Sequence, residues 1–150
     1  MQIWISKLTG DLQTINILNH YIGMSPIDEN SFKELQIFPL VFGGLAVFGL
    51  IVTVFSKRIL LYSWTLALIV FSCVALYDFW AWEYKFGHEL NPDAAIKMED
   101  MVYQPPLIGE KAFLNIVATS YPDIAGLGMM AAVALSISAS VFCLRRAPNK

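Results

Sequence analysis

Charged side chains are scarce in this chain. They make up 15% of its 150 residues, while 57% are hydrophobic, and ordinary soluble proteins carry roughly 25% charged residues. The mean hydropathy is +0.57. Positive charge is also limited, because ten Lys and Arg are outnumbered by twelve Asp and Glu. A nucleic-acid-binding protein needs a basic surface to neutralise phosphates, so the composition excludes that class and indicates a membrane protein.

Cysteine and histidine are equally rare, with two of each. Cys73 and Cys143 fall inside apolar runs, where we expect small buried side chains rather than a disulfide or a zinc pair. The chain has no Cys-x-x-Cys-His haem-attachment motif, no glycine-rich phosphate loop and no His-Glu-x-x-His zinc motif. Nothing pairs a nucleophile with a neighbouring base. We therefore expect a protein that is not an enzyme.

Three apolar stretches are long enough to cross a bilayer, which takes about 20 helical residues. They cover residues 35–55, 59–81 and 123–144, and none has the polar stripe of a soluble amphipathic helix. Only a few residues join the first two, which predicts a tight antiparallel hairpin. The sequence thus predicts an all-α membrane protein, with an outward-facing leader at 1–34 and a three-span membrane domain at 35–150. A long outer loop at 82–122 separates the second and third spans.

Basic residues give the expected orientation. Lys57 and Arg58 lie in the hairpin turn, and Arg145, Arg146 and Lys150 follow the third span, a total charge of +5. The leader, the loop and the outward ends of the spans hold the other five lysines and all twelve acids, a total of −7. Because positive charge collects on the cytoplasmic side, we expect the turn and the C-terminus inside, and the leader and the loop outside.

The leader is predicted to form an amphipathic helix. Apolar residues recur at spacings of three and four from Trp4 to Ile22, and Gly23 with Pro26 ends the pattern. Such a helix lies in the membrane interface. The leader lacks the basic start and compact apolar core of a signal peptide. An outward N-terminus without an export signal is uncommon, which leaves open an upstream span that this chain does not contain.

An aromatic belt is predicted where the second span leaves the hydrocarbon. Its members are Tyr77, Phe79, Trp80, Trp82, Tyr84 and Phe86. We expect the leader to pack its apolar face against this belt, because both lie at one depth and both shed apolar surface. That face consists of Trp4, Leu8, Leu12 and Ile15. Farther along the loop, residues 110–119 are predicted to form a short amphipathic helix.

The acids of the second span's end and the loop are irregularly spaced. They are Asp78, Glu83, Glu89, Asp93, Glu99 and Asp100. A calcium loop needs regular spacing, so we expect a solvated face instead. In the third span, small residues recur every four positions at Gly128, Ala132, Ser136 and Ser140, which predicts a close helix contact within this chain or with another. No Asp, Glu, Lys, Arg or His lies within residues 35–55, 59–77 or 124–144, which disfavours transport by this chain alone.

Five side chains on the expected outer side are candidate metal ligands: His20, Met24, His88, Met98 and Met101. His20 and Met24 are four residues apart and share one face of a helix. Imidazole with thioether suits Cu(I), because soft sulfur selects it over harder divalent ions. A shared site needs two to four of these side chains at donor–metal distances of roughly 2.0–2.4 Å. The alternative is that the histidines are solvated or capping residues and the methionines fill gaps in packing.

Three strings together resemble a known family. They are Leu18-Asn19-His20-Tyr21-Ile22-Gly23-Met24, then Leu76-Tyr77-Asp78-Phe79-Trp80-x-Trp82-Glu83-Tyr84 with Gly87-His88-x-Leu90-Asn91-Pro92, and Tyr103-Gln104-Pro105-Pro106-Leu107-Ile108-Gly109. The chain resembles small integral membrane proteins that accompany the assembly genes of nitrous-oxide reductase, a copper enzyme of the bacterial periplasm. The resemblance covers nearly the whole chain and rests on strings, not on a catalytic motif. Family members carry an extra apolar segment before the leader, which this sequence lacks.

The resemblance implies an accessory protein of denitrification in the bacterial inner membrane, with the leader and the loop in the periplasm. Such a protein helps to mature, supply with copper or electrons, or anchor a periplasmic copper enzyme. Its implied partners are the lipid bilayer and either other membrane subunits or a periplasmic copper protein. Of the family strings, His20, Met24 and His88 have ligand chemistry. The alternatives are a structural membrane subunit without metal and, less favoured because no cofactor ligand pair is evident, a quinone-facing electron-transfer subunit.

Overall fold

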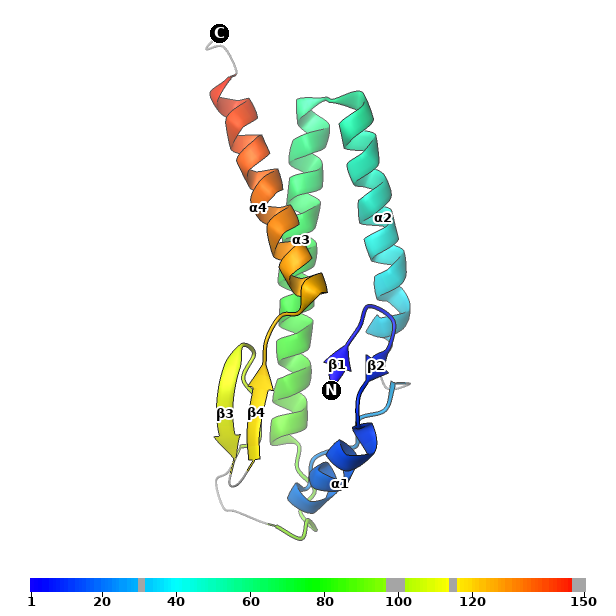
Figure 1. Ribbon diagram of the computed structural model, residues 1–150, viewed down its shortest axis with the longest axis vertical. Helices are drawn as coiled ribbons and strands as arrows, with labels where there is room; N and C mark the ends of the chain where they lie inside the picture. The colour runs from blue at the N-terminus through cyan, green and yellow to red at the C-terminus, as the bar shows by residue number, and fades with distance from the viewer. Residues whose placement is uncertain (30–31, 97–101, 114–115, 147–150) are drawn as a thin grey trace. The chain divides into compact units, whose positions relative to one another are not determined.

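The computed structural model describes residues 1–29, 32–96, 102–113 and 116–146 (Figure 1). In chain order the elements are β1 (Gln2–Ile3), β2 (Leu8–Thr9), α1 (Leu12–Ile22), α2 (Glu34–Phe55), α3 (Arg58–His88), β3 (Gly109–Phe113), β4 (Ile116–Ser120) and α4 (Ile124–Arg145). The chain is mostly helical. Its contacts divide it into a mixed unit, Met1–Phe38 with Tyr77–Tyr121, and a helical unit, Pro39–Leu76 with Pro122–Lys150.

Among the described residues, three helices are long and apolar enough to cross a membrane, with 22 residues in α2, 31 in α3 and 22 in α4. Their large apolar side chains are mostly exposed; Leu40 is 78% exposed, Val54 77% and Leu135 71%. Exposure of so much contiguous apolar surface to water is unfavourable, so the exposure of these side chains is consistent with contact with lipid. The prediction of three membrane-spanning helices is confirmed at this level, and five of the six predicted ends lie within one residue of the helix ends.

The sixth end differs, because α3 continues to His88 instead of stopping at Ala81. At 1.5 Å per residue its 31 residues extend about 46 Å, well beyond a hydrocarbon core of about 30 Å. The prediction ended the helix where charged residues begin. Hydropathy falls there, but no proline interrupts the helix before Pro92. The expected outer loop at 82–122 was therefore wrong in its first seven residues, which are helical.

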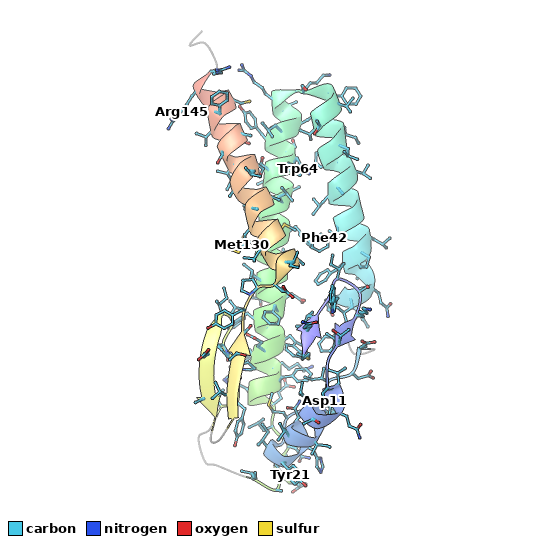
Figure 2. All side chains as sticks on the ribbon, in the orientation of Figure 1. Asp11, Tyr21, Phe42, Trp64, Met130 and Arg145 are labelled. Carbon is cyan, nitrogen blue, oxygen red and sulfur yellow. The ribbon has the colours of Figure 1, made fainter. Side chains whose placement is uncertain are left out.

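The helical unit contains the predicted hairpin of α2 and α3. The indole Nε1–H of Trp64 on α3 donates a 3.1 Å hydrogen bond to the carbonyl oxygen of Leu45 on α2. Gly49 permits this approach, because a Cβ there would lie 3.1 Å from the Trp64 ring. Phe42 and Phe71 pack edge to face with ring centroids 5.1 Å apart. Figure 2 shows Trp64 and Phe42 between the two helices.

The predicted small-residue contact is present within the chain. Ser136 and Ser140 of α4 are only 3% and 9% exposed. Thr65 Oγ1 of α3 lies 3.0 Å from Ser140 Oγ and 3.4 Å from the Ser136 carbonyl oxygen. Gly128, at the other end of the stripe, has open space where a Cβ would be. The stripe therefore brings α4 against α3 through its serine end.

In the mixed unit, only the second part of the predicted leader helix is helical. Residues 2–9 form the antiparallel β1–β2 hairpin, with Gln2 paired to Thr9 and Ile3 to Leu8. Gly10 has φ +115°, which a right-handed helix does not accept. Asp11 then caps α1 by accepting a 3.0 Å hydrogen bond from the amide of Thr14, as aspartate does at helix starts. The prediction of one helix from Trp4 was wrong, whereas its end at Gly23 is confirmed.

The short helix expected at 110–119 was also wrong. The described residues of this range lie in the antiparallel strands β3 and β4, in which Glu110 pairs with Thr119 and Ala112 with Val117. The run from Ile116 to Thr119 is rich in β-branched residues, which favour strands because their χ1 freedom is restricted in helices.

Candidate functional site

The leader packs against one side of the α3 end. The core of the mixed unit consists of Leu8, Ile27 and Leu35, with Leu12, Ile15, Phe32, Trp82 and Phe86 packed against it. Leu8, Leu12 and Ile15 of the leader therefore share one hydrophobic core with Trp82 and Phe86 of the belt. Trp4 does not join it; this side chain is 52% exposed, and its Nε1–H donates to Thr9 Oγ1 at 2.8 Å.

The belt residues divide into two sets along α3. An inner set surrounds Trp82, whose ring centroid lies 4.6 Å from Phe86, 5.2 Å from Phe32 and 6.2 Å from Phe79. An outer set, here called the aromatic ladder, consists of Tyr77, Trp80, Tyr84 and His88. Successive ring centroids in the ladder are 6.0, 5.4 and 3.8 Å apart. Because one helix presents both sets, its end contacts the leader on one side and is exposed on the other.

The end of α1 is bonded to the segment that follows α3. The amide of Asn91 donates a 2.7 Å hydrogen bond to the carbonyl oxygen of Gly23, and the amide of Ile96 donates to that of Tyr21 at 2.9 Å. Gly23 has φ +80°, and a Cβ there would lie 2.9 Å from the Cβ of Ala94. These bonds hold the backbone beside His20 and Met24 against the segment that begins after His88.

The two candidate histidine ligands are both exposed. His20 lies beside Tyr21, with ring centroids 6.2 Å apart. His88 stacks on Tyr84, and its Nδ1 lies 2.8 Å from the Tyr84 carbonyl oxygen. A carbonyl only accepts, so Nδ1 carries the proton in this bond and Nε2 is the nitrogen left to bind a metal.

Of the three methionine candidates, the structure describes Met24. Met24 is half-buried directly after Gly23, whereas Met98 and Met101 lie outside the described residues. Within the described ranges, no three His, Cys, Asp or Glu side chains are grouped so as to hold a metal ion. Any copper site here would therefore rest on the two imidazoles with thioether sulfur, and that shared site stays a prediction.

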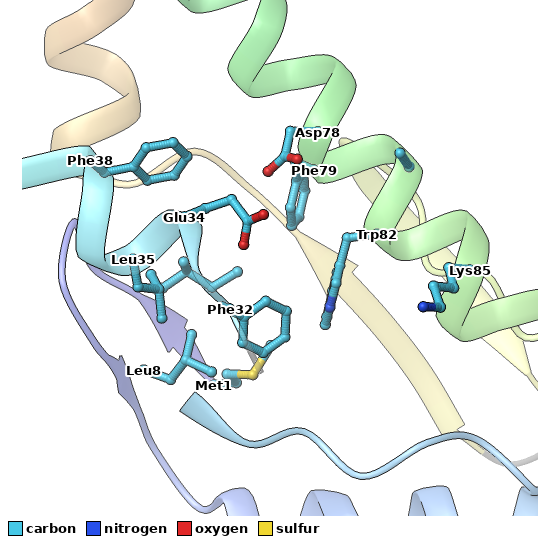
Figure 3. A pocket seen from close by; sticks show the side chains of 12 residues that line it. Met1, Leu8, Phe32, Glu34, Leu35, Phe38, Asp78, Phe79, Trp82 and Lys85 are labelled. Atoms are coloured by element: carbon cyan, nitrogen blue, oxygen red, sulfur yellow. The ribbon is translucent and has the colours of Figure 1, made fainter. Parts of the chain in front are cut away.

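A cavity of about 310 Å³ lies in the mixed unit, and sequence reasoning did not predict it (Figure 3). Its lining includes the apolar Leu8, Leu35, Phe32, Phe79 and Trp82 and the charged Glu34, Asp78 and Lys85. One signal was available. Glu34 and Asp78 are each 22 residues from Ser56 in the turn between the first two helices, so an antiparallel hairpin places the two carboxyl groups at the same level.

Glu83 was expected in the solvated acidic face, and that expectation was wrong. Its side chain is 2% exposed, and Oε2 is buried without a hydrogen-bond partner among the described residues. One turn farther along, Gly87 accepts the close approach of Gln104, whose Cα would lie 2.4 Å from a Cβ at that position. The amide of Tyr103 donates to the Gly87 carbonyl oxygen at 3.2 Å. The returning loop thus packs on α3 close to the Glu83 position.

Comparison with known proteins adds no further assignment. No protein-family model, curated protein or solved structure matches this chain.

Proposed function

We propose that this protein is an accessory subunit of the bacterial inner membrane that serves a periplasmic copper enzyme such as nitrous-oxide reductase. In this proposal α2, α3 and α4 anchor it in the bilayer. The mixed unit faces the periplasm, with α1 in the membrane interface, and the C-terminus lies in the cytoplasm. The charge difference of +5 against −7 between the expected inner and outer segments supports this orientation.

One observation carries the proposal. The three strings on which the family resemblance rests are separated in sequence, yet they contact one another in the mixed unit. Gly23 of the first string accepts from Asn91 of the second, and Gly87 of the second accepts from Tyr103 of the third. Strings that carry the family resemblance, lie far apart in the sequence and yet pack together in the structure are expected to form one functional surface. The proposed function therefore belongs to the mixed unit, with the helices as its anchor.

Copper is the partner chemistry that this surface suits best. His20 and His88 supply imidazole, and Met24 supplies a thioether at the bonded end of α1. Cu(I) accepts this soft donor set, and when bound it would be cargo for delivery to the enzyme. The imidazoles would hold the ion, because the Nδ1 bond of His88 to Tyr84 fixes the ring and leaves Nε2 free to coordinate.

A metal-free structural subunit is the second candidate. Its supporting observation is that His88 already has two partners, the Tyr84 ring at 3.8 Å and the Tyr84 carbonyl oxygen at 2.8 Å. A histidine with these two contacts stabilises the end of the helix without any metal. In that case the mixed unit docks a partner that holds the copper itself.

Anaerobic titration of the purified full chain with Cu(I), against a chromogenic chelator of known affinity, separates the two candidates. The copper proposal predicts one ion per chain, weaker binding for His20→Ala and His88→Ala, and a smaller loss for Met24→Leu and Met98→Leu. Met130→Leu is the matched control, because Met130 is an exposed residue of α4. Binding that is absent, or unchanged in both histidine variants, would leave the structural subunit as the better description.

A further inference from the structure

We propose that the cavity of the mixed unit binds an organic ammonium ion, with its cationic centre between Glu34 and Asp78 and its apolar part against the aromatic side chains. The proposal is independent of copper, because none of the five candidate copper ligands lines the cavity.

The first argument is unbalanced negative charge. Glu34 and Asp78 both line the cavity, and the charge of Glu34 acts repulsively on Asp78. Figure 3 shows the two carboxyl groups directed into the same space. Among the described residues neither carboxyl group has a hydrogen bond or an ion pair. Two like charges that face each other without a counter-charge favour a bound cation.

Lys85 does not supply that cation. It also lines the cavity, but in Figure 3 its amine lies beyond Trp82, on the side away from both carboxyl groups. The charged side chains along the wall are therefore one amine and two carboxylates, and no side-chain cation lies between Glu34 and Asp78 in Figure 3.

The second argument is the nature of the walls. Phe32, Phe79 and Trp82 line the cavity together with aliphatic side chains; the Phe32 and Phe79 ring centroids lie 5.2 and 6.2 Å from that of Trp82. Aromatic faces attract cations through their quadrupole, and quaternary ammonium groups are the ligands that aromatic cages recognise.

The same features disfavour a bare metal ion. Two carboxylates provide too few oxygen ligands for Ca²⁺, which takes six to eight, and no third His, Cys, Asp or Glu is grouped with them in the described ranges. A cation with its own apolar surface fits better. A space of about 310 Å³ falls at the lower end of small-molecule sites, roughly 300–1,000 Å³, which suits a group the size of choline or ethanolamine with a short extension.

The test uses the purified full chain in a non-ionic detergent, titrated with choline by calorimetry. The neutral probe is 3,3-dimethylbutan-1-ol, which has the shape of choline without its charge. We expect choline to bind at least tenfold more tightly than the neutral alcohol. Equal affinities, or no choline binding, would overturn the proposal.

Variants locate the site. Asp78→Asn and Glu34→Gln should each weaken choline binding, and the double variant should weaken it at least tenfold. Glu110→Gln is the matched control, because Glu110 is an exposed carboxylate on β3. Circular dichroism and thermal unfolding of each variant identify any that do not fold, in which case the single variants are compared. Normal choline binding by a folded Asp78→Asn, Glu34→Gln double variant would also overturn the proposal.

The ammonium group has two natural sources, a free amine and a lipid headgroup, and nanodiscs distinguish them. Choline is titrated into the protein in phosphatidylglycerol nanodiscs, and again after phosphatidylethanolamine is included. If the lipid is the natural ligand, the ethanolamine headgroup should occupy the cavity and suppress choline binding. If binding is the same in both, a free amine is the ligand. Either result supports an ammonium site.

Discussion

The amide nitrogen of Asn91 lies 2.7 Å from the carbonyl oxygen of Gly23, a hydrogen bond that joins the end of α1 to the segment after α3. It forms across a glycine with φ +80° whose missing Cβ leaves room for Ala94 and the Asn91 backbone. This junction holds the segments of both candidate histidines in one unit.

Gly23→Ala should open this junction. Alanine is disfavoured at positive φ by roughly 1–2 kcal/mol, and its Cβ would lie 2.9 Å from that of Ala94 and 3.0 Å from the Asn91 carbonyl oxygen. Hydrogen–deuterium exchange should accelerate at the amides of Asn91 and Ile96. Gly43→Ala is the control, because a Cβ at Gly43 meets no atom within 4 Å. Equal protection in both variants would show that the junction does not depend on Gly23.

Thr65→Val should loosen the contact of α4 with α3. The substitution preserves shape but removes the oxygen that lies 3.0 Å from Ser140 Oγ. Hydrogen bonds between membrane helices contribute about 0.6 kcal/mol on average and up to about 1.7, so we expect a loss within that range in thermal unfolding in detergent. Ser63→Ala is the control, because Ser63 is exposed and bonds only to the Ile59 carbonyl oxygen of its own helix. A stability unchanged from the native chain would argue against the contact.

Glu83→Gln should stabilise the protein. Burying a charged carboxyl group with an unpaired oxygen costs free energy, and the amide has the same shape without the charge. We expect a gain of about 1 kcal/mol, or roughly 2–4 °C in the unfolding temperature for a chain of this size. Glu110→Gln, on the exposed side of β3, should change little. A clear loss of stability in Glu83→Gln would instead indicate that the charge of Glu83 is used.

The start of α1 should weaken in acid. Hydrogen bonds from the Thr14 hydroxyl and amide lower the pKa of Asp11 below its usual value near 3.8. A lowered pKa stabilises the folded state above the unfolded pKa, and that contribution is lost as the pH falls through the folded value. Amide exchange at Thr14 should thus become less protected, relative to α3, below about pH 4. Asp11→Asn also caps a helix and should remove this pH dependence, so a response that persists in it would point to another group.

The orientation is tested by labelling single cysteines at Ser31, Asn91 and Asn149 in intact spheroplasts, after Cys73 and Cys143 are replaced. An impermeant thiol reagent should reach positions 31 and 91 but not 149, because the basic residues favour the cytoplasm for the C-terminus. Labelling at 149 without labelling at 91 would reverse the proposed orientation.

The three long apolar helices were predictable because the hydropathy of a residue does not depend on its tertiary contacts. The end of α3 was not, because Asp78 and Glu83 lower hydropathy without interrupting the helix. The four strands of the described residues, β1 to β4, were missed for a different reason. The spacing of apolar residues in such short segments fits a helix or a strand. What decides between them is the glycine turn and helix cap at Gly10 and Asp11, and the β-branched run from Ile116 to Thr119.

The site residues were predictable to different degrees. Glu34 and Asp78 are equally far in sequence from the hairpin turn, which places their side chains at the same level of the two helices. The charged part of the cavity could therefore have been predicted from the sequence. The burial of Glu83 was not, because its cover depends on how the chain near Tyr103 returns to Gly87. Contacts of that kind depend on tertiary packing and leave no local pattern.

The aromatic ladder of α3 has a consequence for the kind of membrane this helix tolerates. From Tyr77 to His88 it covers about 16 Å along the helix axis at 1.5 Å per residue, whereas the polar interface on each side of a bilayer is only about 5–8 Å thick. In the proposed membrane orientation, at least one side chain of the ladder therefore meets the headgroup layer even when the helix shifts along its axis by a full turn of 5.4 Å. Since bilayers of different organelles and bacteria differ in thickness by a few ångströms, the ladder keeps an interfacial side chain at the boundary in thin and thick membranes alike.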